Sequence, residues 1–172
     1  GQAELVLVSA RLVWGVLGSD TARFSAFVRG PRAMLAYLRA RLPRTLGHNP
    51  LGGAMIVALL TLLIAQATTG LMANDGLSFQ GPLAHAVSRV TSDLMTDAHG
   101  LIAGVLLAAV TIHVSAVLLH AIVKRDNLIT PMWTGWARWP TGTVAPDIRG
   151  LRPWLATVLT MTILLRLALL AG

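Results

Sequence analysis

Cysteine is absent from the 172 residues of the chain. Its absence excludes iron–sulfur clusters held by thiolates, zinc sites with cysteine ligands and covalently attached c-type haem within this chain. It also removes any indication of the cellular compartment that disulfides would give. A cofactor bound to this chain must be held by other side chains.

Charged residues are scarce as well. They make up 12% of the chain, against about 25% in a typical soluble domain. Hydrophobic residues make up 55%, and the mean hydropathy is +0.68. Because the apolar residues fall in long blocks, the sequence predicts an all-α integral membrane protein with a single domain over residues 1–172. Membrane lipid is therefore an expected partner.

The few charges that are present are mostly basic, with a net charge of +7. Lysine and arginine concentrate in two connections, 18–50 and 124–152, and form no basic helix. This distribution indicates membrane topology and not a nucleic-acid partner. By the positive-inside rule both connections face the cytoplasm, and the loop 73–97 faces the opposite side.

Four apolar blocks predict four transmembrane helices that pack as a bundle: 1–17, 51–72, 98–123 and 153–171. Gln66 lies deep in the second block and needs a hydrogen-bond partner, which favours a packed bundle. Because the sequence opens at Gly1 without a methionine, we expect the native protein to start further upstream.

The first basic connection also contains a helical pattern. Residues 31–41 predict a short amphipathic helix at the membrane interface, with Pro31 in its first turn. Four of its residues are expected to face lipid: Met34, Leu35, Tyr37 and Leu38.

Three histidines lie in the third block, where imidazoles are costly and usually mark function. His99 and His113 are fourteen residues apart. A helix returns them to within about 40° of the same face and separates them by about 21 Å. One helix would thus offer a nitrogen ligand near each leaflet, as a bundle with two stacked haems requires. The alternative is that they are core histidines bonded to neighbouring helices. His120 shares the stripe of His113 but lies near the cytoplasmic interface.

Four runs of sequence resemble the bacterial b-type cytochromes. They are ARLVWGVLGSDTARFSAFVRGP at 10–31, LGHNPLGGAMIVALL at 46–60, TTGLMANDGLSFQGPLA at 68–84 and HVSAVLLHAIVKRDNLITPMWTG at 113–135. The branch that the chain resembles most is the cytochrome b subunit of membrane-bound nickel–iron hydrogenases, within the cytochrome b-561 group. The resemblance covers residues 1–135 and leaves 136–172 as an additional loop and helix.

This resemblance implies a multi-pass protein of the bacterial cytoplasmic (inner) membrane that works with other subunits of a membrane redox complex. It would bind two b haems, each between two histidines, and pass electrons between a periplasmic partner and membrane quinone. His99 and His113 match the two ligands of the family's fourth helix. Arg11 matches a motif residue that we place near a haem propionate. The His48-Asn49-Pro50 turn matches as well, although a structural role at the interface is equally compatible for His48. His85 receives no role.

In that family the opposite haem ligands come from a first helix and the start of a second, and both would precede Gly1. Three explanations fit: the segment lies upstream, another chain supplies the ligands, or the chain is a haem-free relative. The last one corresponds to an alternative function as an accessory or structural subunit of a larger membrane complex. The sequence has no paired carboxylates and no activated serine beside a histidine, so we expect an electron-transfer subunit and not a stand-alone enzyme.

Overall fold

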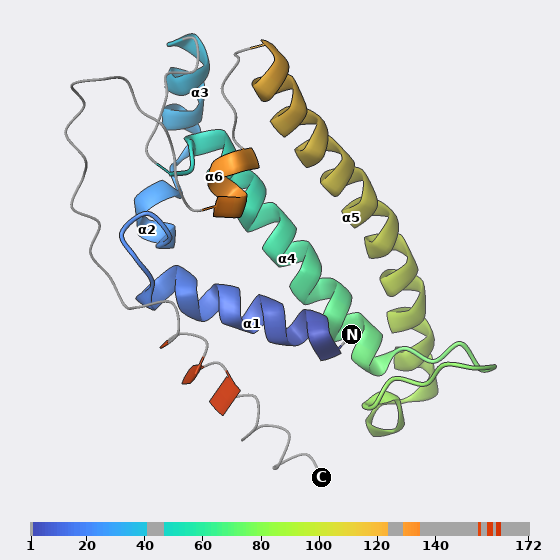
Figure 1. Cartoon of the computed structure of the whole chain (residues 1–172). Helices are drawn as coiled ribbons and strands as arrows, with labels where there is room; N and C mark the ends of the chain where they lie inside the picture. The colour runs from blue at the N-terminus through green and yellow to red at the C-terminus, as the bar shows by residue number, and fades with distance from the viewer. Residues whose placement is uncertain are drawn as a thin grey trace.

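The computed structural model of the chain describes residues 2–40, 47–123 and 129–134, together with residues 155, 158–159 and 161–162. Over these ranges the chain is helical (Figure 1). The elements are α1 (Gln2–Leu17), α2 (Phe24–Phe27), α3 (Pro31–Arg39), α4 (Pro50–Met72), the 3-10 helix η1 (Ala84–Ala86), α5 (Arg89–Val123) and α6 (Ile129–Thr134). In the described ranges β pairing is limited to one isolated bridge, between Asn74 and Gln80. The predicted all-α class is confirmed.

Two helices are long and apolar enough to cross a membrane. They are α4, with 23 residues, and α5, with 35 residues. At about 1.5 Å per residue, α4 alone matches the roughly 30 Å of a hydrocarbon core. The predicted span 1–17 forms a helix, but α1 has 16 residues, short of the roughly 20 that a span needs. Most of the predicted span 153–171 lies outside the described residues, so four spans remain a prediction.

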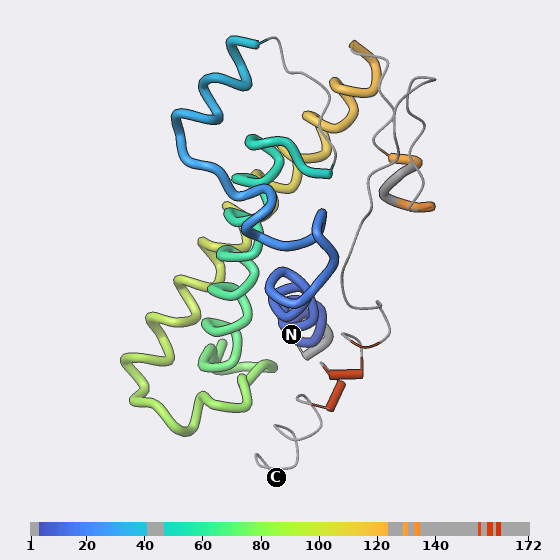
Figure 2. The backbone as a smooth tube through the Cα atoms, turned by 90° about the vertical axis from the view of Figure 1, so that its left-hand side faces the viewer, coloured from blue at the N-terminus to red at the C-terminus, as the bar shows by residue number. Residues whose placement is uncertain are grey.

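The helix α4 lies at the centre of the fold and packs against α1, α2, α3 and α5. Its start is well defined, because the side chain of Asn49 accepts a hydrogen bond from the backbone N–H of Gly52 at 2.8 Å and Pro50 occupies the first turn. From there α4 runs antiparallel to α5, its principal neighbour, and α1, seen end-on in Figure 2, lies beside it.

The outward face of α5 is apolar and open. Leu101 is 71% exposed and Leu107 is 69% exposed. Exposed leucines over several turns are costly in water and are the expected surface of a helix that faces lipid or other helices. The membrane assignment explains this face.

The predicted end of the loop 73–97 is wrong. The sequence predicts a loop up to residue 97 and a span from residue 98, but α5 begins at Arg89. Ser88 caps the start of the helix, since its side chain accepts a hydrogen bond from the backbone N–H of Thr91 at 3.1 Å. The hydropathy pattern marks only where the helix becomes apolar, whereas hydrogen bonding starts two and a half turns earlier.

The polar first turns of α5 are tied to the end of α4. The hydroxyl of Ser92 donates to the carbonyl of Met72 at 2.8 Å. The hydroxyl of Thr96 accepts from the backbone N–H of Asn74 at 2.9 Å. The last carbonyls of a helix lack donors within the helix, and Ser92 of α5 supplies a donor to one of these carbonyls of α4. The two helices are therefore fastened together at this end.

A second correction concerns α3. The predicted short helix is present over Pro31–Arg39 and leaves Leu35 and Leu38 about half exposed, while its place at the membrane interface stays a prediction. Tyr37, however, is 8% exposed and does not face lipid, because α3 packs against α4 and turns this ring inward.

The connection after α4 forms a compact turn around Asp75. One oxygen of its carboxylate accepts hydrogen bonds from the backbone N–H groups of Leu77, Ser78 and Phe79 at 2.9 to 3.0 Å. These N–H groups stabilise the ionised form and lower the pKa of Asp75 to about 2.

We expect this turn to lose order in acid. The pKa of Asp75 in the folded chain, about 2, lies below its ordinary value of 3.8. The carboxylate therefore stabilises the turn above pH 3.8, and this contribution is lost as the pH falls through 2. The ¹³C shift of the Asp75 carboxyl group should titrate with its midpoint near 2. The amide shifts of the turn should change with the same midpoint, and in D75N this change should be absent. A midpoint at the ordinary value would contradict the turn geometry.

Candidate functional site

The histidine His99 of α5 points its ring at α4, where one residue contacts both ring nitrogens. The Nδ1 atom of His99 lies 3.0 Å from the backbone oxygen of Gln66, and its Nε2 atom lies 3.0 Å from the side-chain nitrogen of Gln66. The hydroxyl of Thr69 is 3.2 Å from Nδ1. The partner that Gln66 was predicted to need is thus His99.

These contacts determine the tautomer of His99. A backbone carbonyl can only accept a hydrogen bond, so Nδ1 carries the proton and donates to Gln66. The lone pair of Nε2 then accepts from the side-chain amide of Gln66. Histidines that bind metals are held in this way, with one nitrogen donating to a carbonyl or carboxylate and the other presented for coordination.

The ring of His99 fits against α4 because residue 70 is glycine. A Cβ atom at Gly70 would lie 2.8 Å from Cε1 of His99 and 3.2 Å from its Nδ1. Carbon atoms in contact are normally about 3.5 Å apart or more. Glycine thus creates the space in which the imidazole lies.

A second group of predicted site residues gathers around the start of α4. The ring of His48 packs on Phe27, with 4.9 Å between the ring centroids, and Phe27 is 2% exposed. Arg11 of α1 lies over the rings of Phe24 and Phe27, at 5.1 and 5.8 Å from their centroids. A Cβ atom at Gly53 would lie 2.5 Å from the backbone oxygen of Phe27, so glycine at this position allows α2 to approach α4.

The second group interacts electrostatically with His113 of α5. Burial lowers the pKa of His48, and the neighbouring positive charges of Arg11 and His113 lower it further. His48 is therefore neutral at pH 7. Among the described residues Arg11 has no carboxylate partner: its guanidinium approaches the carbonyl of Ala22 at 3.4 Å. Arg11, His48 and His113 thus form a basic cluster, and the guanidinium charge of Arg11 suits an anionic group.

The predicted site residues therefore lie in two places. His99 belongs to a hydrogen-bonded site with Gln66, Thr69 and Gly70. His113, which is half-buried, belongs with Arg11 to the basic cluster at the other end of α4. His85 and His120 join neither place. In the described part of the chain no three histidine or acidic side chains converge to form a metal site on their own.

Two contributors were missed at the level of sequence. Phe24 and Phe27 enclose the guanidinium of Arg11, and Phe27 also covers His48. Two phenylalanines in a basic connection do not by themselves predict that their rings contact an arginine on another helix. The His48-Asn49-Pro50 turn matches a family motif, and the structure places His48 beside Phe27.

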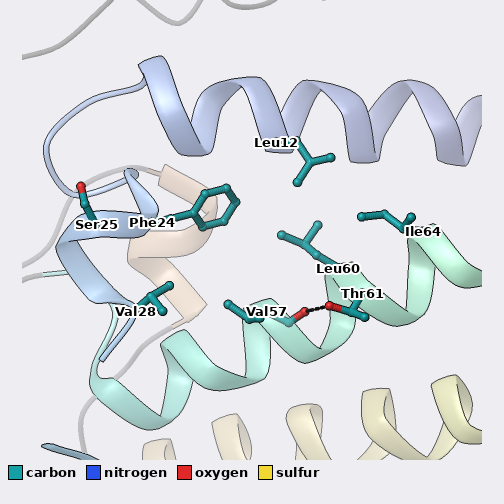
Figure 3. Close-up of a pocket in the computed structure, with 8 residues that line it drawn as sticks. All are labelled: Leu12, Phe24, Ser25, Val28, Val57, Leu60, Thr61 and Ile64. Carbon is teal, nitrogen blue, oxygen red and sulfur yellow. Dashed lines mark hydrogen bonds between the residues drawn. The ribbon is translucent and has the colours of Figure 1, made fainter. Parts of the chain in front are cut away.

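An open groove of about 490 Å³ lies between α1 and α4, with α2 at one end (Figure 3). Its lining is apolar apart from two hydroxyl groups, and that of Thr61 already donates to the carbonyl of Val57 at 2.9 Å. The groove therefore offers no ligand to a metal. It is lined by Leu12, Phe24, Ser25, Val28, Val57, Leu60, Thr61 and Ile64.

Comparison with known proteins identifies one family. A family model described as prokaryotic cytochrome b561 matches residues 1–135. No curated protein and no solved structure matches the chain.

The contact between Gly70 and His99 can be tested by substitution. We expect G70A to lower the free energy of unfolding by about 1–3 kcal/mol, because the new methyl group must displace the imidazole. The control is G104A on α5, where a Cβ atom would meet nothing within 4 Å. That change should be neutral or stabilising by up to about 1 kcal/mol. Thermal unfolding in detergent, followed by circular dichroism, measures both. Equal stability of G70A and G104A would show that the ring does not lie against residue 70.

Proposed function

The chain belongs to the prokaryotic cytochrome b561 family, whose members are membrane-integral electron-transfer proteins with b-type haem, and from this premise we propose that it holds two haems on α5. His99 and His113 would be one axial ligand of each. Haem iron supplies reversible one-electron exchange when it is bound. The residues of the chain set where the iron lies, what surrounds it and which charges it experiences.

The observation that carries this proposal is the environment of His99. Its Nδ1–H donates to the carbonyl of Gln66 at 3.0 Å, which is how ligand histidines of metal centres are oriented. The Nε2 atom, whose lone pair faces the side-chain amide of Gln66 in this structure, would be the atom that coordinates the iron. The donor chemistry of His99 therefore fits a haem iron, and each iron needs a second axial ligand beyond the one that α5 offers.

The environment of His113 fits the second haem for a different reason. A haem carries two propionates, and an anion near Arg11 would balance the charge of the basic cluster. Phe24 and Phe27 partly cover the guanidinium of Arg11, and partial burial strengthens such an ion pair. We infer that Arg11 binds a propionate of the haem held by His113, with neutral His48 beside it.

The direction of electron transfer follows from the predicted topology. With the basic connections in the cytoplasm, His99 lies near the periplasmic surface and His113 lies toward the cytoplasm. Fourteen residues of helix separate the two levels by about 21 Å. A periplasmic subunit would supply electrons at the His99 level, and membrane quinone would accept them at the His113 level. We propose that the chain is a multi-pass subunit of a redox complex in the bacterial inner membrane, of the kind that serves a nickel–iron hydrogenase.

A second candidate function is supported by the same hydrogen bonds. Both nitrogens of His99 have partners on α4, as they would in a histidine that only joins two helices. The chain would then be a haem-free accessory subunit. The two functions differ in a direct measurement of haem.

A reduced-minus-oxidised absorption spectrum of the purified full-length protein distinguishes them. We expect a b-type α band, and we expect H99A and H113A each to remove about half of it, because each variant deletes one ligand. H85A and H120A are matched controls, since neither histidine joins a site, and they should retain the band. A flat spectrum from the unmodified protein would instead support the accessory subunit.

The role of Arg11 can be tested by potentiometry. A positive charge near the haem favours the reduced state, so R11Q should lower the midpoint potential of one haem. A loss of about 1 kcal/mol corresponds to a shift of roughly 40 mV. The control is R23Q, because the charge of Arg23 is paired with Asp20 at 3.6 Å and its side chain is 40% exposed, so its removal should leave both potentials unchanged. Equal potentials in R11Q and the unmodified protein would place the propionate elsewhere.

A further inference from the structure

We propose that the side chain of Gln66 is a displaceable cap on His99, which holds the imidazole ready for iron in the haem-free chain and leaves when haem binds. The inference rests on the proposed function, because it takes His99 to be a haem ligand. It concerns what Gln66 does before the haem arrives.

The two contacts of Gln66 with His99 have different consequences for a ligand. The first uses the backbone oxygen of Gln66, at 3.0 Å from Nδ1. It fixes the ring without depending on any side chain of α4. The second uses the side-chain amide nitrogen, at 3.0 Å from Nε2. This amide lies on the lone pair that iron would need, so amide and iron exclude each other.

The cap satisfies the hydrogen bonding of His99 but not that of Gln66 itself. An imidazole nitrogen left without a partner at membrane depth is costly, and the amide removes that cost. The side-chain oxygen of Gln66, however, is buried and has no hydrogen-bond partner. The cap therefore satisfies His99 while leaving one acceptor of its own unsatisfied. An arrangement of this kind is stable enough to persist and weak enough to be displaced.

The surroundings allow the amide to move while the ring stays. Gly70 leaves the space in which the ring lies, and the hydroxyl of Thr69 is 3.2 Å from Nδ1, beside the bond to the carbonyl. Both features remain when the amide leaves. The glutamine side chain has three rotatable bonds, so its displacement requires no movement of α4.

The first test uses the haem-free full chain and ¹⁵N spectra of the His99 ring. We expect Nδ1 to be protonated and Nε2 to be an unprotonated, hydrogen-bonded acceptor. In Q66L the Nε2 resonance should move to the position of a free lone pair, and Nδ1 should stay protonated because the backbone carbonyl is still present. T68V is the matched control on α4: Thr68 is exposed and bonds to the carbonyl of Ile64, so its loss should change neither nitrogen.

The second test is a titration with haemin, followed by the Soret band. It uses the H113A background to isolate the His99 level, with imidazole added to supply the second axial ligand. Removing the cap should make Q66L bind haemin roughly three- to ten-fold more tightly, since one competing hydrogen bond is lost. T68V should bind as the parent does, and adding H99A should abolish the gain of Q66L.

The outcomes separate this proposal from the proposed function. A protonated Nε2 in the unmodified chain overturns the cap, and that observation needs no variant to fold. Equal or weaker haemin binding in Q66L also overturns it, because Gln66 would then support the ligand without competing for it. If no form of the chain binds haemin while the ¹⁵N spectra show the capped tautomer, the proposed function fails and Gln66 is a fixed partner of His99.

Discussion

The pairing of α4 with α5 depends on satisfying an imidazole inside the membrane. An unpaired ring nitrogen at that depth is costly, and the bilayer offers no water to compensate. The chain solves this with three residues within about one turn of α4: a glutamine that contacts both nitrogens of His99, a buried threonine and a glycine that leaves space for the ring. The orientation of α5 about its own axis follows from this contact, and so does the direction in which His113 points, fourteen residues further along.

The surroundings of the two histidines of α5 differ in their physical character. The environment of His99 is neutral and depends on directional hydrogen bonds with a backbone carbonyl and an amide. The environment of His113 is basic, with Arg11 held over aromatic rings and His48 kept neutral by burial and by its charged neighbours. Redox centres in such different fields would differ in potential, since a nearby cation favours the reduced form. A gradient along one helix would then arise from the residues around it and not from the ligands, which are identical.

Much of this could be predicted from sequence, and the failures have physical causes. The apolar block 51–72 and the Pro31 helix were predicted correctly because hydropathy and proline position are local signals. Gln66 was expected to need a partner, and the spacing of His99 and His113 follows from helix geometry. The start of α5 at Arg89 was missed because its first turns are polar and held by contacts to α4. Tyr37 and Phe27 were missed because burial depends on which helix lies opposite, which a single sequence does not contain.

The hydrogen bonds of Ser92 and Thr96 to the end of α4 fix the position of α5 along the axis of α4. Ser92 precedes His99 by seven residues, or about 10 Å of helix. Sliding α5 along α4 by even one residue would break these hydrogen bonds. The distance from this hydrogen-bonded end of the helix pair to the imidazole of His99 is therefore set by the protein itself. Bilayers of different thickness would adapt around the pair, so a redox centre held by His99 would lie at the same distance from the loop in each of them.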